Sequence, residues 1–319
     1  MRRALVTGGT GFLGLHVVHA LESRGVEVVT VARGAGATHR GSILDPALLE
    51  RAMNGCDAVF HLAGRVDRSR HAMAVLTELH VHGTLAVLEA AARAGISRVV
   101  YASTSGTIAV SRDPLKFHTE QDPPPTDLVA GWPYYATKLQ AEQAAFRSAA
   151  SLDLERVSVN PSLLLGPEDH RGSSTTDVAD VLQGRVPALP SGGLSFVDVR
   201  DVATAAVSAW ERGTPGARYL LGAANWSLDR FIGTVAELGG VRAPRWRAPD
   251  RPVRWLARMS APVFERMSLH PPLDPISIEM SQHFWYFDSG LAQRELAFLP
   301  RDPTETLRET IAWLRSEAT

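Results

Sequence analysis

The stretch TGGTGFLG, residues 7–14, decides the fold expected for this chain. It follows a short apolar run at residues 3–7 (RALVT) and opens a segment at 12–24 whose apolar residues recur at helical spacing. Its glycines satisfy two spacings, GxxGxxG from Gly8 and GxGxxG from Gly9. Glycine tolerates positive φ in a tight turn, and without a Cβ it lets the backbone approach a pyrophosphate at a helix N-terminus. The stretch therefore predicts a strand–turn–helix unit that binds a dinucleotide.

This turn has two other interpretations. A glycine-rich turn without a ligand is the plainer one, and the flanking strand and helix argue against it. A phosphate-transferring P-loop is not expected, because no Lys-Ser/Thr pair follows the last glycine. The candidate cofactor-binding residues of the turn are Gly8, Gly9, Thr10, Gly11, Phe12, Leu13 and Gly14.

The first half of the chain alternates short apolar runs with longer helical patterns. Strand-like runs occupy residues 3–7, 26–32, 58–62 and 98–103, and helical patterns occupy 12–24, 46–54 and 70–94. The strand-like runs have no polar face, as in a sheet that is covered on both sides. This alternation predicts an α/β fold, a Rossmann-type doubly wound parallel sheet.

The regular alternation ends near residue 165, after which prolines separate short segments. We expect an NADP(H)-binding Rossmann domain over residues 1–165, to which 194–222 return, beginning with a strand and a helix at 194–209. Residues 166–193 and 223–290 would form a smaller substrate-binding lobe. Residues 291–319 would close the fold, with a helix over 303–315.

Composition narrows the classes of function. The chain has 319 residues, 21% of them charged, and a formal net charge of −1, which does not favour a nucleic-acid partner. Its one cysteine, Cys56, excludes an intramolecular disulfide. The N-terminal apolar run is too short for a signal peptide, and no apolar segment approaches the length of a membrane span. These features predict a cytoplasmic protein without a membrane partner.

The end of the second strand-like run bears on the choice of nicotinamide cofactor. An NAD site of this design usually has an acidic residue there that binds the ribose 2′-hydroxyl, but Ala32 takes that position and Arg33 follows. An arginine can form paired, charge-assisted hydrogen bonds to a 2′-phosphate. We therefore predict NADP(H), with Arg33 as the binding residue and Arg40 as a weaker candidate. The alternative is that Arg33 is an ordinary solvated loop residue.

Tyr134 and Lys138 are the candidate acid–base pair. They stand four residues apart in a helical segment, 132–146, so they share one helix face. A nearby ammonium favours the phenolate and is expected to lower the pKa of the tyrosine. A YxxxK pair alone is common, but the upstream glycine turn makes it specific. Tyr135 has no lysine at the same offset and is interpreted as packing or as a wall of the substrate site.

A hydroxyl group should complete this constellation. The run ending in Ser103-Thr104-Ser105 places three hydroxyls at the carboxyl end of the sheet, where open α/β folds bind ligands. No metal is expected, because His80 and His82 have no further ligands at metal spacing. Both histidines are assigned to helix packing.

These residues together resemble the extended short-chain dehydrogenase/reductases over most of the chain. Beside the glycine turn and the Tyr134/Lys138 pair, the matching segments are DAVFHLAG (57–64), residues 99–105, Asn160-Pro161-Ser162 with Gly166-Pro167, and FVDVRDVA (196–203). Within that family the chain is most similar to the branch of dihydroflavonol reductases, 3β-hydroxysteroid dehydrogenases, bacterial 3-ketoacyl-type reductases and hopanoid-associated epimerase-like proteins. The features that point to this branch are the VARG turn, STSGT, and the stretch from His170 to Gly193.

The resemblance implies roles for individual residues. Thr104 becomes the catalytic hydroxyl, with Ser105 as the runner-up, and Tyr134 becomes the proton donor that Lys138 supports. It also implies a homodimer through the helix at about 70–94 and the helix that carries the Tyr/Lys pair. The further cofactor-binding residues implied are Leu62, Ala63, Gly64, Pro161, Ser162 and Leu163.

The function expected is hydride transfer between NADP(H) and a small carbonyl or alcohol substrate. An apolar or ring-containing substrate is one interpretation of the bulky residues in the smaller lobe, and ordinary core is the other: Trp226, Trp246, Trp255, Phe264, Phe284, Trp285, Tyr286 and Phe287. The first rival is a sugar-nucleotide epimerase or dehydratase that retains its NAD(P). Cations for its diphosphate could come from Arg171, Arg185, Arg245, Arg247 and Arg251. The second rival is a non-catalytic NADP(H)-binding redox regulator.

Overall fold

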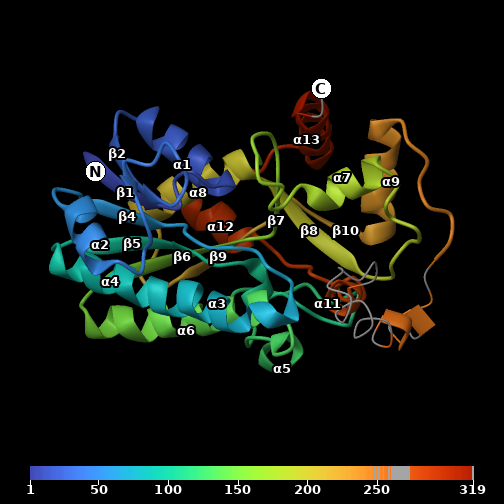
Figure 1. Cartoon of the computed structure of the whole chain (residues 1–319), viewed down its shortest axis with the longest axis horizontal. Coiled ribbons are helices and arrows are strands. Elements are labelled where there is room, and N and C mark those ends of the chain that lie inside the picture. The colour runs from blue at the N-terminus through green and yellow to red at the C-terminus, as the bar shows by residue number, and fades with distance from the viewer. Residues whose placement is uncertain (248, 250–251, 254, 258, 260–273, 318–319) are drawn as a thin grey trace.

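A seven-stranded, all-parallel sheet forms the centre of the larger of two lobes (Figure 1). The computed structural model describes residues 1–247, 249, 252–253, 255–257, 259 and 274–317. The strand order is β3-β2-β1-β4-β5-β6-β9, so the order reverses beside β1, where α/β sheets bind ligands. The strands are β1 (Arg3–Thr7), β2 (Glu27–Ala32), β3 (His39–Arg40), β4 (Ala58–His61), β5 (Arg98–Ala102), β6 (Glu155–Pro161) and β9 (Arg218–Leu221).

Helices cover both faces of this sheet (Figure 1). On one face, α1 (Phe12–Glu22), α8 (Val199–Arg212) and α12 (Gly290–Leu296) pack on strand residues such as Ala4 and Val6. On the other, α2 (Pro46–Met53), α4 (Gly83–Arg93) and α6 (Pro133–Ser151) pack on the alternate residues, such as Leu5. Because successive strand residues point to opposite faces, an unbroken apolar run supplies both cores. The Rossmann-type fold expected from the sequence is confirmed.

The smaller lobe is built on a three-stranded sheet, β10-β8-β7, in which β8 pairs antiparallel with β10 and parallel with β7. Its apolar core includes Phe196, Trp226 and Phe231. Residues 193–198 thus lie in the small sheet, whereas α8 and β9 pack in the larger lobe. The elements here are β7 (Leu163–Leu165), β8 (Gly193–Asp198), β10 (Ala224–Ser227), α7 (Thr176–Leu182), α9 (Leu228–Gly239), α11 (Pro275–Met280) and α13 (Pro303–Glu317).

The segment expected as one long helix, 70–94, is interrupted. It consists of a 3₁₀ turn η1 (Arg70–Ala72), α3 (Met73–Thr77), a π turn η2 (Glu78–His82) and α4. The wider π turn places His80 in the interior and leaves His82 exposed. Two short elements complete the fold, η3 (Ser105–Thr107) and α5 (Thr126–Val129). Within the described part of the chain, no helix has the length and apolar character that crossing a membrane requires.

Candidate active site

A cavity of about 1300 Å³ opens at the carboxyl edge of the large sheet, and residues of both lobes line it. It brings together the predicted site residues with a single exception, Gly9. The predicted residues that line it are Gly8, Thr10, Gly11, Phe12, Leu13, Gly14, Arg33, Leu62, Ala63, Gly64, Thr104, Tyr134, Lys138, Pro161, Ser162 and Leu163.

The glycine turn between β1 and α1 has the tight geometry that a dinucleotide requires. Gly8 has φ +74°, and the Gly11 N–H donates to the Gly8 carbonyl oxygen at 2.8 Å. A Cβ at Gly14 would lie 2.1 Å from that same oxygen, so only glycine fits. A Cβ at Gly9 would instead lie 2.6 Å from Thr30 Cγ2, which means that Gly9 packs on β2 behind the turn. This cradle, at the N-terminus of α1, fits the phosphates of a nicotinamide dinucleotide.

The loop after β4 is fixed directly beside this turn. The Leu62 N–H donates to the Thr7 carbonyl oxygen at 3.1 Å, and the Ala63 N–H donates to Thr7 Oγ1 at 3.3 Å. Thr7 Oγ1 also bonds His61 Nδ1 at 2.7 Å, and His61 Nε2 bonds Thr84 Oγ1 at 2.9 Å. Burial lowers the pKa of His61 to about 3, so this histidine is neutral and structural at neutral pH.

Tyr134 lies in the first turn of α6 with its phenol in the cavity. Thr104, which follows β5, lines the same cavity, and its side chain favours the ionised phenol against the larger effect of burial. The Tyr134 ring meets those of His80 and Tyr135 edge to face, with centroids 5.8 and 4.9 Å apart. Burial raises the pKa of Tyr134, so the phenol holds its proton at neutral pH. Ser103, Thr104 and Ser105 all line the cavity, so the assignment of Thr104 as the catalytic hydroxyl stays a prediction.

Lys138 does not act on the phenol as the sequence suggested. Its ammonium is buried and donates to the Ala102 carbonyl oxygen at 2.7 Å. Burial lowers the pKa of Lys138 to about 8, and the nearby Glu142 carboxylate opposes this shift. In this structure the lysine charge is therefore held by β5, and the expected lowering of the tyrosine pKa is absent.

Glu142, which sequence reasoning missed, anchors a polar network beneath the site. Its buried carboxylate accepts from Thr107 Oγ1 at 3.0 Å and Asn160 Nδ2 at 2.8 Å, and pairs with Arg218 at 3.3 Å. The signal was present, because Glu142 is four residues after Lys138 on one helix. Its partners come from η3, β6 and β9.

The two histidines considered for metal binding have different environments. His80 is buried, accepts from the Arg65 N–H at 3.2 Å through Nε2, and bonds Thr137 Oγ1 at 2.9 Å through Nδ1. Burial and Lys138 lower its pKa to about 3, so it is neutral. His82 is exposed and pairs with Glu78 at 2.8 Å. Packing was thus correct for His80 and wrong for His82, because residues two apart on a helix point to nearly opposite sides.

Apolar side chains of the smaller lobe form one wall of the cavity, beside polar ones such as Asp177, Asp180 and Ser195. Trp285 is in contact with Tyr135, with ring centroids 4.8 Å apart, and both line the cavity. Trp246 and Trp255 do not line it and are 80% and 65% exposed, and Phe264 lies outside the described residues. The other apolar residues of this wall are Leu164, Val181, Val186, Leu194, Leu228, Phe231, Ile232 and Met280.

Few of the arginines considered for a sugar-nucleotide diphosphate reach the cavity. Arg171 lines it, whereas Arg185 pairs with Asp180 and Arg247 pairs with Asp229 on the surface. Arg251 lies outside the described residues. Arg68, which was not expected, lines the cavity and pairs with Asp177 of α7 at 3.4 Å.

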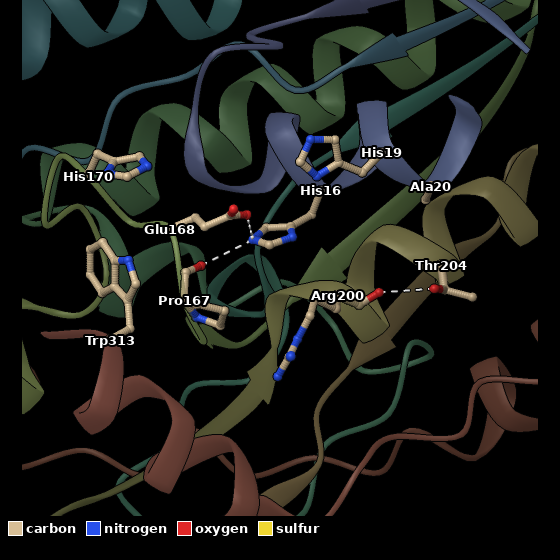
Figure 2. Close-up of a pocket in the computed structure, with 9 residues that line it drawn as sticks. All are labelled: His16, His19, Ala20, Pro167, Glu168, His170, Arg200, Thr204 and Trp313. Carbon is tan, nitrogen blue, oxygen red and sulfur yellow. Dashed lines mark hydrogen bonds and ion pairs between the residues drawn. The ribbon is translucent and has the colours of Figure 1, made fainter. Parts of the chain in front are cut away.

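A second cavity, of about 670 Å³, lies among α1, α8 and α13 (Figure 2). His16, His19 and Glu168 each place one potential ligand atom there, all within 4.8 Å of one another. However, His16 Nε2 faces the Pro167 carbonyl oxygen at 3.2 Å and Glu168 Oε2 at 3.4 Å, as the dashed lines of Figure 2 show. These contacts dock the loop after β7 on α1.

Residues 4–222 match the model of the NAD dependent epimerase/dehydratase family. A putative dihydroflavonol 4-reductase from Synechocystis sp. is 30% identical over 98% of this chain and 94% of that protein. Cinnamoyl-CoA reductase 1 from Oryza sativa subsp. japonica is 35% identical over 67% of this chain and 69% of that protein.

Solved structures agree with the fold. The crystal structure of gox2253 superposes with a TM-score of 0.84 at 29% identity and covers 99% of both chains. The UDP-glucose 4-epimerase of Thermus thermophilus, in complex with NAD, superposes with a TM-score of 0.74 at 24% identity, covering 98% of this chain and 99% of that one. These two structures show the same fold as this chain.

Proposed function

This chain belongs to the NAD-dependent epimerase/dehydratase family, the extended short-chain dehydrogenase/reductases. We propose that it is an NADP(H)-dependent reductase within this family. Its substrate would be a small ketone or aldehyde that is apolar or contains a ring. One observation carries the proposal: a single cavity holds the glycine turn, Thr104, Tyr134 and the buried Lys138 beside an apolar wall. The two named relatives, both reductases, support the same reaction class.

The chain's own residues account for the acid–base part of such a reaction. When bound, the nicotinamide supplies or accepts the hydride. Tyr134 holds a proton that it can give to the developing alkoxide oxygen of the substrate. Thr104 would hydrogen-bond the same oxygen. Lys138, which donates to the Ala102 carbonyl oxygen, is proposed to support the cofactor ribose. Donors placed in advance at the developing charge are an effective source of rate enhancement.

The experiment is a screen of ketones and aldehydes with NADPH, comparing wild type with Tyr134→Phe. Tyr134→Phe is expected to lower kcat by at least about 10²–10³, the usual loss for one such donor, while NADPH still binds. Tyr286→Phe removes a phenol outside the cavity lining and serves as the control. Full activity in Tyr134→Phe would remove this residue from the mechanism.

The cofactor assignment has a test of its own. Arg33 lines the cavity at the end of β2, where Ala32 leaves no carboxylate to repel a 2′-phosphate. Titration of NADPH and NADH into wild type should show preference for NADPH, and Arg33→Ala should reduce that preference by about tenfold or more. A wild-type preference for NADH would contradict the assignment.

The domain division and the homodimer expected from the sequence are proposed with this function. The apolar wall does not favour a sugar-nucleotide substrate. The Thr104–Tyr134 pair does not favour a non-catalytic regulator. A cofactor that stays bound through turnover would favour an epimerase or dehydratase instead.

A further inference from the structure

Arg171 is a cation that the smaller lobe contributes to the cofactor cavity. It lies in the loop between β7 and α7 and lines the same cavity as the glycine turn. Its guanidinium forms no hydrogen bond or ion pair with the residues that the structure describes, unlike Arg185 of the same lobe, which is bound to Asp180. An arginine fork without a protein partner, directed into a ligand cavity, is suited to an anionic group of the ligand.

The Arg171 guanidinium lies against Gly34, the residue after Arg33. A Cβ built on Gly34 would lie 2.9 Å from Arg171 Nη2 and 2.7 Å from Thr10 Oγ1. The Arg171 guanidinium and the Thr10 hydroxyl therefore lie at the end of β2, where Arg33 directly precedes Gly34 in the chain and also lines the cavity. In dinucleotide-binding folds the adenosine ribose 2′ position lies at this end of the second strand.

The loop that carries Arg171 is rigidly built. The buried carboxylate of Asp169 accepts from the N–H groups of Ser173, Ser174 and Thr175 at 2.8–3.0 Å, and from the hydroxyls of Ser173 and Thr175 at 2.8 and 3.1 Å. At its base, Pro167 and Glu168 meet His16 of α1, as Figure 2 shows. The backbone that carries Arg171 is thus held in place before a ligand arrives, which lowers the entropic cost of binding.

We propose that Arg171 binds the 2′-phosphate of NADP(H) together with Arg33, so that this phosphate connects the smaller lobe to the nucleotide-binding lobe. The inference rests on the proposed NADP(H) function and deepens it. A cavity lined by two cationic side chains, Arg33 and Arg171, calls for a dianionic group. A 2′-phosphate meets this requirement, and the 2′-hydroxyl of NAD(H) does not.

The test uses two nucleotides that differ only in the 2′-phosphate, 2′,5′-ADP and 5′-AMP. Their affinities are measured by calorimetry on the full chain for wild type, Arg171→Gln and Arg185→Gln. Arg171→Gln should weaken the binding of 2′,5′-ADP by about 10–100-fold, the range for hydrogen bonds to a charged group. The affinity for 5′-AMP should not change. Arg185→Gln removes the same charge from the same lobe and should change neither affinity. Equal thermal unfolding of the three proteins confirms that they are folded.

The outcomes separate the two proposals. If wild type prefers 2′,5′-ADP and Arg171→Gln keeps that preference, this inference is overturned and the NADP(H) function stands. If Arg171→Gln weakened the binding of both nucleotides equally, Arg171 would lie at the 5′-phosphate, and this inference would also be overturned. If wild type binds 2′,5′-ADP no better than 5′-AMP, both proposals fail.

The connection between lobes has an independent readout. In wild type, 2′,5′-ADP should slow amide hydrogen exchange across residues 169–183, because the phosphate holds this loop and α7 against the larger lobe. The same saturating ligand should give no slowing in Arg171→Gln. Equal slowing in both proteins would contradict the connection.

Discussion

Glu142 sets the charge state of Lys138 from below the cavity. Its carboxylate favours the ammonium and opposes the burial that lowers the pKa of Lys138 to about 8. Glu142→Gln keeps the side-chain shape but removes this charge, so the pKa of Lys138 should fall further. The bond from Arg218 to the Glu120 carbonyl oxygen remains in the variant.

An NMR titration of ¹⁵N-labelled lysine side chains checks this prediction. Glu89→Gln makes the same chemical change on the exposed face of α4, where Glu89 pairs with Arg93. An unchanged Lys138 titration in Glu142→Gln would show that Glu142 has only a structural role.

Single residues differ in how far the sequence reveals them. Tyr134, Lys138 and Glu142 share one helix at spacings of four, a relation that can be counted along the chain. The hydrogen bond from Lys138 to the Ala102 carbonyl oxygen could not be predicted from helical spacing, because Ala102 lies on β5, 36 residues before Lys138 in the sequence. The sequence therefore predicted which residues meet, but it gave the wrong direction for the pKa of Tyr134.

Among the elements, the β1–α1 turn has the least tolerance for a side chain. A methyl group at Gly14 would lie 2.1 Å from the Gly8 carbonyl oxygen and 2.8 Å from its carbon, both backbone atoms. Gly14→Ala should therefore displace the turn and destabilise the fold by about 1–3 kcal/mol, as overpacking does. It should also weaken the binding of NADPH by more than about tenfold. Calorimetric titration and urea denaturation measure the two effects.

Gly233→Ala is the matched control, because Gly233 also lies within a helix but has open space around its Cβ position. It should stabilise α9 by about 0.5–1 kcal/mol and leave cofactor affinity unchanged. If Gly14→Ala binds NADPH as wild type does, the turn does not hold the cofactor.

Elements with regular periodicity were predictable, and irregular ones were not. The strands β1, β2, β4 and β5 begin and end within about two residues of the expected runs, as assignments of this kind allow. The π turn at Glu78–His82 escaped prediction because apolar spacing does not register one extra residue in a single turn. That turn decides which histidine faces Tyr134.

At the scale of the whole molecule, the cavity depends on how the chain passes between lobes. Family signatures placed the glycine turn, Tyr134 and Pro161 in one site without a structure. The loop around Asp169 that brings Arg171 to Gly34 joins residues 137 positions apart, and no periodicity reports such a contact. The nucleotide half of the site was thus more predictable than the half from the smaller lobe.

Two buried neutral histidines should make the stability of the whole fold sensitive to acid. Burial lowers the pKa values of His61 and His80 to about 3, whereas both titrate near 6.5 when unfolded. As pH falls below 6.5 the unfolded chain takes up protons that the folded chain does not, so the free energy of unfolding decreases and continues to decrease toward pH 3. Between pH 7 and 5 the loss should be about 2 kcal/mol for each histidine, above the usual range of carboxylate titration.

Urea denaturation at pH 7 and pH 5 measures this loss directly. His61→Gln should remove about half of it, although the variant is less stable at pH 7 because Thr7 and Thr84 lose their ring partner. His82→Gln, at an exposed position, should retain the full loss. A wild-type stability that is equal at the two pH values would mean that His61 and His80 take up protons without unfolding, which contradicts their neutral role in the folded protein.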